Sequence, residues 1–151
     1  MAALAGRLPA RSRSTRAGRM HPNRRPGEHR PSTDARACAA RSGVVLLVEE
    51  RYIDGTRIAG QENYINIRHG DGTIAGYVHL TLDGALVEVG ESVERGQPIG
   101  LSGDTGSSAA PHLHFHVQAG PDRGTVPVTF RNTESHPRGL REGQLYAALP
   151  W

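Results

Sequence analysis

The stretch from residue 64 to residue 89 reads YINIRHGDGTIAGYVHLTLDGALVEV. It consists of short runs rich in β-branched and aromatic residues, and the runs are separated by the glycine-containing turns 70–72 and 83–84. The strands expected in this stretch are 64–68, 74–82 and 85–89. Strands this short, with turns at such close spacing, favour an all-β fold over a βαβ arrangement.

The same pattern continues on both sides of this stretch. The further expected strands are 44–50, a short one around Val93, 98–101 and 112–118. No long helical periodicity is present, and only residues 140–149 carry a short helix-like run. The sequence therefore predicts an all-β domain at 39–125, built as a small antiparallel sheet or barrel-sandwich hybrid, followed by a C-terminal extension at 126–151.

Residues 1–38 differ in composition from the rest and are expected to form a disordered, Arg-rich head. Residues 1–41 hold ten arginines against Glu28 and Asp34, whereas residues 42–151 hold eight arginines against thirteen acidic residues. The head has no aromatic residue to stack on bases, so no nucleic-acid partner is expected. No stretch approaches the roughly 20 apolar residues of a stable membrane span, and the first residues lack the apolar run of a signal peptide.

Residues 111–117, PHLHFHV, carry the most informative chemical pattern. Side chains alternate between the two faces of a strand. The residues expected on the core face are Leu113, Phe115 and Val117. Those expected on the opposite face are His112, His114 and His116. A single histidine there would be an ordinary polar residue. Three in register indicate zinc ligands or bases, because clustered imidazoles repel each other once they are protonated.

A second histidine-bearing segment lies in the expected strand 74–82. In the sequence YVHL, Tyr77 and His79 are expected to share a face, so that His79 offers a base from across the sheet. The glycine-rich segment 100–108 precedes the three histidines and allows the backbone to approach a ligand closely. Alone, a strand histidine is more often structural and a glycine-rich segment is more often a plain turn, so their value lies in their combination.

Together these segments resemble the lysostaphin-type (LytM-like) zinc endopeptidases. The motifs of that family, roughly G-N-x-V-x-I-x-H, Y-x-H-L, V-x-x-G-x-x-V-x-x-G-Q-x-I-G-x-x-G-x-T-G and P-H-L-H-F-E, occur here in the same order. They are found at 62–69, 77–80, 87–106 and 111–116. The last motif departs from the family at His116, where the family usually has Glu. The resemblance covers about residues 40–120.

The resemblance implies both a function and residue roles. It implies a zinc-dependent endopeptidase that hydrolyses peptide cross-links of bacterial peptidoglycan in the cell envelope, either periplasmic or secreted. His114 matches a zinc ligand, and His112 and His79 match the two catalytic histidines. His69 matches a position that is not a ligand, so it is interpreted as structural.

The other two zinc ligands of the family come from an upstream H-x-x-x-D motif, followed by a G-T-P-V-like strand. Here the candidates are His29 and Asp34, but one residue too many lies between them and no G-T-P-V follows. Codons for residues 34–38, read one base later, can encode Thr-Pro-Val-x-Ala, which is the missing segment. The hypothesis is that the head is read in the wrong frame. The chain as given is then expected to bind zinc weakly or not at all, which would leave it inactive, and to lack an edge strand of its β core.

Two readings from other classes are weighed against the peptidase. A catalytically degenerate regulator or binding partner of cell-wall hydrolases would also lack zinc ligands, but such proteins usually lose the histidines as well. A lipoyl- or biotinyl-carrier barrel would share the glycine and valine spacing of 87–97, but it needs a lysine to acylate and this chain has none. The retained His79, His112 and His114 therefore favour the enzyme.

Overall fold

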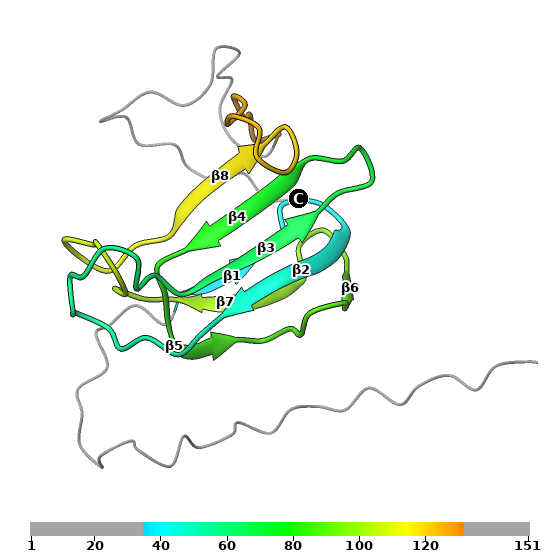
Figure 1. Ribbon diagram of the computed structural model, residues 1–151. Helices are drawn as coiled ribbons and strands as arrows, with labels where there is room; N and C mark the ends of the chain where they lie inside the picture. The colour runs from blue at the N-terminus through cyan, green and yellow to red at the C-terminus, as the bar shows by residue number, and fades with distance from the viewer. Residues whose placement is uncertain (1–34, 132–151) are drawn as a thin grey trace, which may run out of the picture.

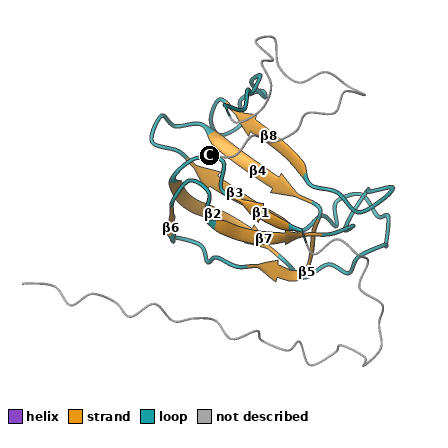
Figure 2. Ribbon diagram, turned by 180° about the vertical axis from the view of Figure 1, so that it is seen from behind, coloured by secondary structure: helices purple, strands orange, loops and turns teal. Residues whose placement is uncertain are grey.

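The computed structural model describes residues 35–131 as an all-β fold. Its strands are β1 (Arg36–Cys38), β2 (Gly43–Glu49), β3 (Tyr64–Arg68), β4 (Ile74–Val78), β5 (Leu80–Ala85), β6 (Ser92–Val93), β7 (Pro98–Ser102) and β8 (His114–Gln118). Only strands and loops occur within this range (Figure 2). Residues 35–131 also contain no helix long and apolar enough to cross a membrane. The helix-like run at 140–149 and most of the expected head lie outside the described residues.

The strands form two antiparallel sheets (Figure 1). The larger sheet has the order β6-β2-β3-β4-β8 and the smaller one has the order β1-β7-β5. A hairpin at the expected turn joins β3 to β4 through residues 69–73. Every pair of neighbouring strands in the two sheets is antiparallel. The predicted all-β, antiparallel fold is confirmed.

The hydrophobic core lies between the two sheets because both contribute to it. Its members are small and branched apolar side chains with one tyrosine: Ala37, Ala39, Val45, Ile65, Ile67, Ala75, Tyr77, Leu80, Ala85, Val87, Val93 and Ile99. The sheets pack closely at Gly100, where a Cβ would lie 3.2 Å from Ile65 Cδ1 and 3.3 Å from Leu80 Cδ1. The core is therefore closed from both sides at the centre of the molecule.

The edge of the smaller sheet differs from the expectation drawn from composition. Arg36–Cys38, assigned to the disordered head, form β1 and pair with β7. Ala37 and Ala39 are buried in the core, while Cys38 is exposed as a free thiol. The expectation that an edge strand is missing is thus wrong. Backbone pairing to β7 and two small inward alanines suffice to form β1.

The expected single strand 74–82 is two strands in different sheets. β4 ends at Val78 in the larger sheet, and β5 begins at Leu80 in the smaller one. His79 lies between them with a φ of 63°, a left-handed conformation that few non-glycine residues adopt. The expected strand 85–89 is likewise absent as a unit, because β5 already ends at Ala85. The chain therefore changes sheets at His79.

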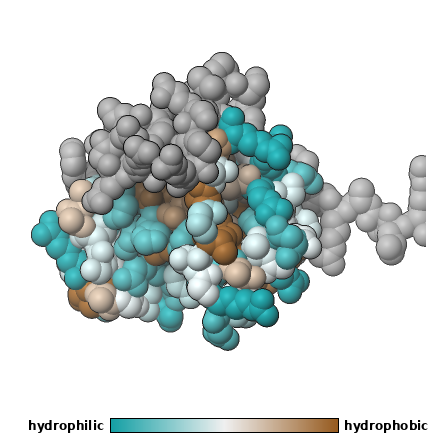
Figure 3. Space-filling view, turned by 90° about the horizontal axis from the view of Figure 1, so that it is seen from above, coloured by the Kyte–Doolittle hydropathy of each residue, from teal (hydrophilic) through white to brown (hydrophobic). Residues whose placement is uncertain are grey.

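The exposed large hydrophobic residues of 35–131 lie mostly in loops, with Leu47 of β2 as an exception. Seen from above, the described surface shows hydrophobic side chains near its middle with hydrophilic ones around them (Figure 3). The large hydrophobic residues with the greatest exposure are Ile53, Val89, Leu47 and Ile58. Single exposed apolar residues of this kind are normal for a globular surface.

Candidate active site

His79 is held in one orientation by the glycine-rich segment. Its side chain is only 7% exposed, and its Nδ1 lies 2.7 Å from the carbonyl oxygen of Thr105. A carbonyl oxygen has no proton to donate, so Nδ1 carries the hydrogen of this bond. The neutral imidazole therefore presents a bare Nε2, which is the form that can accept a proton.

Thr105 is fixed in turn from two directions. Its hydroxyl accepts a hydrogen bond from Asn63 N at 3.0 Å and donates one to the carbonyl of Leu80 at 2.8 Å. Both Thr105 and Asn63 are fully buried. The carbonyl that orients His79 is thus part of a buried network between β3, β5 and the glycine-rich segment. The sequence signal for this network is the pair of polar residues Asn63 and Thr105, which lie in the motif segments 62–69 and 87–106.

His112 is tied to the same segment through Gly103. The N–H of Gly103 donates to the carbonyl of His79 at 2.8 Å, and the N–H of His112 donates to the carbonyl of Gly103 at 3.1 Å. The Nδ1 of His112 lies 2.8 Å from the carbonyl of Ala110, so this ring also carries its proton on Nδ1 when neutral. The hydroxyl of Ser108 lies 3.3 Å from the same nitrogen. Two histidines therefore have the same tautomer.

The structure brings His79, His112 and His114 together. The ring centroids of His79 and His112 are 4.8 Å apart, and those of His79 and His114 are 5.9 Å apart. His114 is exposed at the start of β8, opposite Val78 at the end of β4. Within residues 35–131 no hydrogen bond is made by its ring, so both nitrogens are open to a ligand. The rings form one cluster with free imidazole nitrogens.

The face assignment that led to His79 was wrong in its details. Tyr77 and Leu80 are both buried in the core, although a regular strand would place them on opposite faces. The left-handed conformation of His79 breaks the alternation, and its ring packs against Thr105 and His112. At the other strand, Phe115 and Val117 pack against the core as expected, but Leu113 is 37% exposed because β8 begins only at His114.

His116 continues the row of histidines along β8. Its ring is perpendicular to that of His114, with centroids 5.5 Å apart, and it lies over Gly76 of β4. A Cβ at position 76 would lie 2.5 Å from the imidazole, so any larger residue there would displace the ring of His116. Burial, followed by the charge of His114, lowers the pKa of His116. Its buried Nδ1 has no hydrogen-bond partner among residues 35–131. His116 is therefore stabilised in its neutral form.

Glu62 brings a carboxylate to the same segment. Its Oε1 accepts hydrogen bonds from Ser107 N at 3.3 Å and Gly60 N at 3.2 Å. Burial acts to raise the pKa of Glu62, but these backbone N–H groups, its own N–H and the charge of His79 together hold the pKa below its usual value. A Cβ on Gly106 would occupy the space of the Glu62 side chain. The carboxylate therefore holds the glycine-rich segment in place through its hydrogen bond with Ser107 N.

The described residues do not by themselves make a zinc site. Zinc takes three protein ligands and an open position in catalytic sites. Within residues 35–131 no group of three or more His, Cys, Asp or Glu side chains is arranged to hold a metal ion. His114 is one available imidazole, and the other candidate ligands, His29 and Asp34, lie outside the described residues.

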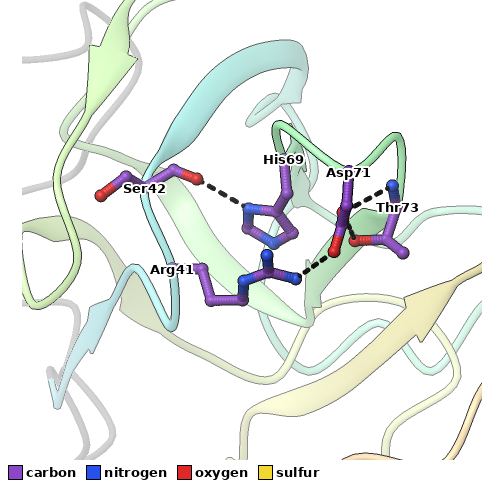
Figure 4. A network of polar contacts seen from close by, with 5 residues as sticks. All are labelled: Arg41, Ser42, His69, Asp71 and Thr73. Atoms are coloured by element: carbon purple, nitrogen blue, oxygen red, sulfur yellow. Dashed lines mark hydrogen bonds and ion pairs between the residues drawn. The ribbon is translucent and has the colours of Figure 1, made fainter.

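His69 lies in the β3–β4 turn and has a different environment (Figure 4). It is 4% exposed, and its Nδ1 donates to the carbonyl of Ser42 at 3.0 Å. The same turn is closed by Asp71, which accepts hydrogen bonds from the N–H and the hydroxyl of Thr73. Asp71 also forms an ion pair with Arg41 at 2.7 Å. The hydroxyl of Thr73, followed by Arg41, holds the pKa of Asp71 well below its usual value. This histidine connects β2 to a turn, in agreement with a structural role.

Comparison with known proteins identifies one family. The model of peptidase family M23 matches residues 29–128. The peptidoglycan DD-endopeptidase ShyA of Vibrio cholerae is 47% identical over 75 residues, which cover 50% of this chain and 15% of the relative. An uncharacterised metalloprotease of Haemophilus influenzae is 39% identical over 74 residues, covering 48% of this chain and 14% of the relative. This chain thus spans only a small part of these relatives.

A solved structure shares the fold. The catalytic domain of the prophage-encoded M23 protein EnpA from Enterococcus faecalis superposes with a TM-score of 0.52 at 25% identity. The superposition covers 68% of this chain and 81% of that domain. The superposition therefore extends over most of that catalytic domain.

Proposed function

Because this chain belongs to peptidase family M23, we propose that it is a metalloendopeptidase that hydrolyses peptide cross-links of bacterial peptidoglycan. The observation that carries the proposal is a cluster of three histidines, in which the ring centroid of His79 lies 4.8 Å from that of His112 and 5.9 Å from that of His114. The name of the ShyA relative supports peptidoglycan as the substrate. Such a substrate places the protein in the cell envelope, periplasmic or secreted.

We propose zinc as the cofactor, with His114 as one ligand. The supporting observations are its exposed ring without a hydrogen bond from residues 35–131 and the match to a metallopeptidase family. His29 and Asp34 are the candidates for the remaining ligands. When bound, zinc would polarise the scissile carbonyl and lower the pKa of a water molecule.

His79 and His112 are proposed to move protons. Each neutral ring has its proton on Nδ1, fixed by a carbonyl, and a bare Nε2. One ring accepts the proton of the attacking water as general base. The resulting imidazolium stabilises the tetrahedral oxyanion or protonates the leaving amine. Gly103 forms backbone hydrogen bonds with both His79 and His112, which would fix the position of one ring relative to the other during these two steps.

The direct test is digestion of purified, cross-linked peptidoglycan by the full chain with zinc supplied in excess. Cleavage should convert cross-linked dimers of muropeptides to monomers, as measured by chromatography and mass spectrometry, and a chelator should stop it. A matched His69→Gln variant, altered outside the cluster, should retain activity. Binding of peptidoglycan without any conversion would overturn the proposal.

A second candidate is a catalytically degenerate regulator of cell-wall hydrolases. It is favoured by the missing three-ligand group within residues 35–131. Such a protein would bind a hydrolase and change that enzyme's rate while producing no monomers alone. Assaying the chain with and without an added cell-wall amidase separates the two functions.

A further inference from the structure

The loop between β2 and β3 carries a carboxylate that is packed against the backbone around His79. Asp54 in this loop accepts three hydrogen bonds. Its Oδ2 accepts from the Thr81 hydroxyl at 2.7 Å and from Leu82 N at 3.2 Å. Its Oδ1 accepts from Asp104 N at 2.7 Å. One half-buried side chain therefore connects two segments that are separated by more than twenty residues.

Both of these segments hold His79. Thr81 and Leu82 lie in β5, two and three residues after His79. Asp104 stands between Gly103, which donates to the His79 carbonyl, and Thr105, which accepts from His79 Nδ1. Asp54 thus fixes the backbone after His79 relative to the backbone that orients its ring.

The packing at Gly103 shows how closely the carboxylate fits. A Cβ at this position would collide with Asp54 Oδ1 and with the N and Cα atoms of Thr81. The carbonyl of Asp104 also accepts a hydrogen bond from Gly55 N at 2.9 Å, which adds a second attachment of the same loop. The loop is therefore bound to the glycine-rich segment by side-chain and backbone contacts.

His79 needs such support because its backbone is strained. With a φ of 63° it occupies the left-handed region, which is unfavourable for a residue with a Cβ. Conformations of this kind persist where the surroundings determine them, and they are concentrated at functional sites. The acceptors for Leu82 N and Asp104 N lie on Asp54, so removing it frees both flanks of the strained residue.

We propose that Asp54 is a positioning residue for His79, which keeps the imidazole in the Nδ1–H tautomer by locking residues 81–82 to residues 103–105. Only the kinetic consequence of this inference rests on the proposed function, because the tautomer of His79 can be measured without catalysis. An Asp54 that merely stabilises a loop would leave the tautomer of His79 unchanged.

The chain offers a matched control in Asp71. This carboxylate also accepts from a threonine hydroxyl and a backbone N–H, both of Thr73, and it also closes a turn. Its turn adjoins His69 and not His79. Asp71→Ala therefore removes a comparable set of hydrogen bonds without touching the support of His79.

The test is ¹⁵N NMR of the full chain at about pH 9, where histidines with ordinary pKa values are neutral. In the wild type and in Asp71→Ala, the His79 Nδ1 should show the shift of a protonated ring nitrogen. In Asp54→Ala it should move toward the shift of a bare nitrogen as the other tautomer becomes populated. In parallel, kcat for peptidoglycan cleavage should fall roughly 10–100-fold, the effect typical of lost outer-shell partners, with KM within about twofold.

A second pair of variants covers the case in which Asp54→Ala does not fold. Thr81→Val removes one hydrogen bond to Asp54 and should shift the tautomer in the same direction, whereas Thr81→Ser retains the hydroxyl and should restore the wild-type signal. An unchanged His79 tautomer in every folded variant that lacks an Asp54 contact would overturn the proposal. The NMR result does not depend on catalysis, so an inactive wild type would count against the proposed function and not against this role.

Discussion

Two buried histidines, His69 and His79, make the same local contact and have different surroundings. Both are nearly inaccessible, and both donate from Nδ1 to a backbone carbonyl, at 3.0 and 2.7 Å. The ring of His79 faces His112 and His114, whereas His69 connects Ser42 to the β3–β4 turn. Burial and a single hydrogen bond are therefore shared by the proposed base and the structural residue, and the two differ in their neighbouring imidazoles.

The largest expected effect is at His114. We expect His114→Ala to lower zinc affinity at least tenfold, because a proposed ligand is lost and loss of even an outer-shell partner costs about 10–100-fold. Peptidoglycan cleavage should be abolished even with zinc in excess. Competition against a fluorescent chelator measures the affinity. A variant with unchanged zinc affinity would show that His114 is not a ligand.

The next effect separates proton transfer from metal binding. His112→Ala and His79→Ala should each lower kcat roughly 10²–10⁴-fold, the range typical of a lost general acid or base. Their zinc affinity should stay close to that of the wild type. Isothermal titration with zinc and steady-state kinetics on a cross-linked muropeptide provide both values. Loss of zinc in His112→Ala equal to that in His114→Ala would mean that the two roles are assigned the wrong way round.

The opposite pattern is expected at His69. His69→Ala leaves the Ser42 carbonyl without its partner, so the free energy of unfolding should fall by about 1–3 kcal/mol. Activity per folded molecule should stay at the wild-type level. Urea denaturation followed by circular dichroism gives the stability. Lost activity at unchanged stability would show that the contrast between the two histidines is false.

The same contrast shows what sequence could predict of the fold. Glycine turns and β-branched runs located most strands, because these signals act within a few residues. They failed at β1, where Arg36–Cys38 carry only one inward side chain, the small Ala37. That strand exists because β7 offers a backbone edge, which no local pattern of residues 36–38 reveals.

At the site, motif matching located the histidines, and the periodicity argument failed for a physical reason. The alternation rule requires extended backbone, and His79 has a left-handed φ. The contacts that support this conformation come from Asp54 and Thr105, about 25 residues away on either side. Such support comes from tertiary contacts, so it could not be predicted from the alternation pattern of residues 74–82.

The smallest expected effect concerns two carboxylates, Glu62 on the His79 side and Asp71 on the His69 side. Both have a pKa held below its usual value, so each contributes stability when ionised. For Glu62 this contribution is fully present above its ordinary pKa of 4.5 and is lost as the pH falls through the lower pKa of the folded state. The difference in unfolding free energy between wild type and Glu62→Gln should therefore be constant from about pH 6 to 7 and shrink in acid.

Asp71→Asn should show a pH dependence of the same sign. Urea denaturation at several pH values measures both. A difference that grows on acidification for Glu62 would mean that burial outweighs the hydrogen bonds from Ser107 and Gly60, and the clamp on the glycine-rich segment would then be weaker than the one on the β3–β4 turn.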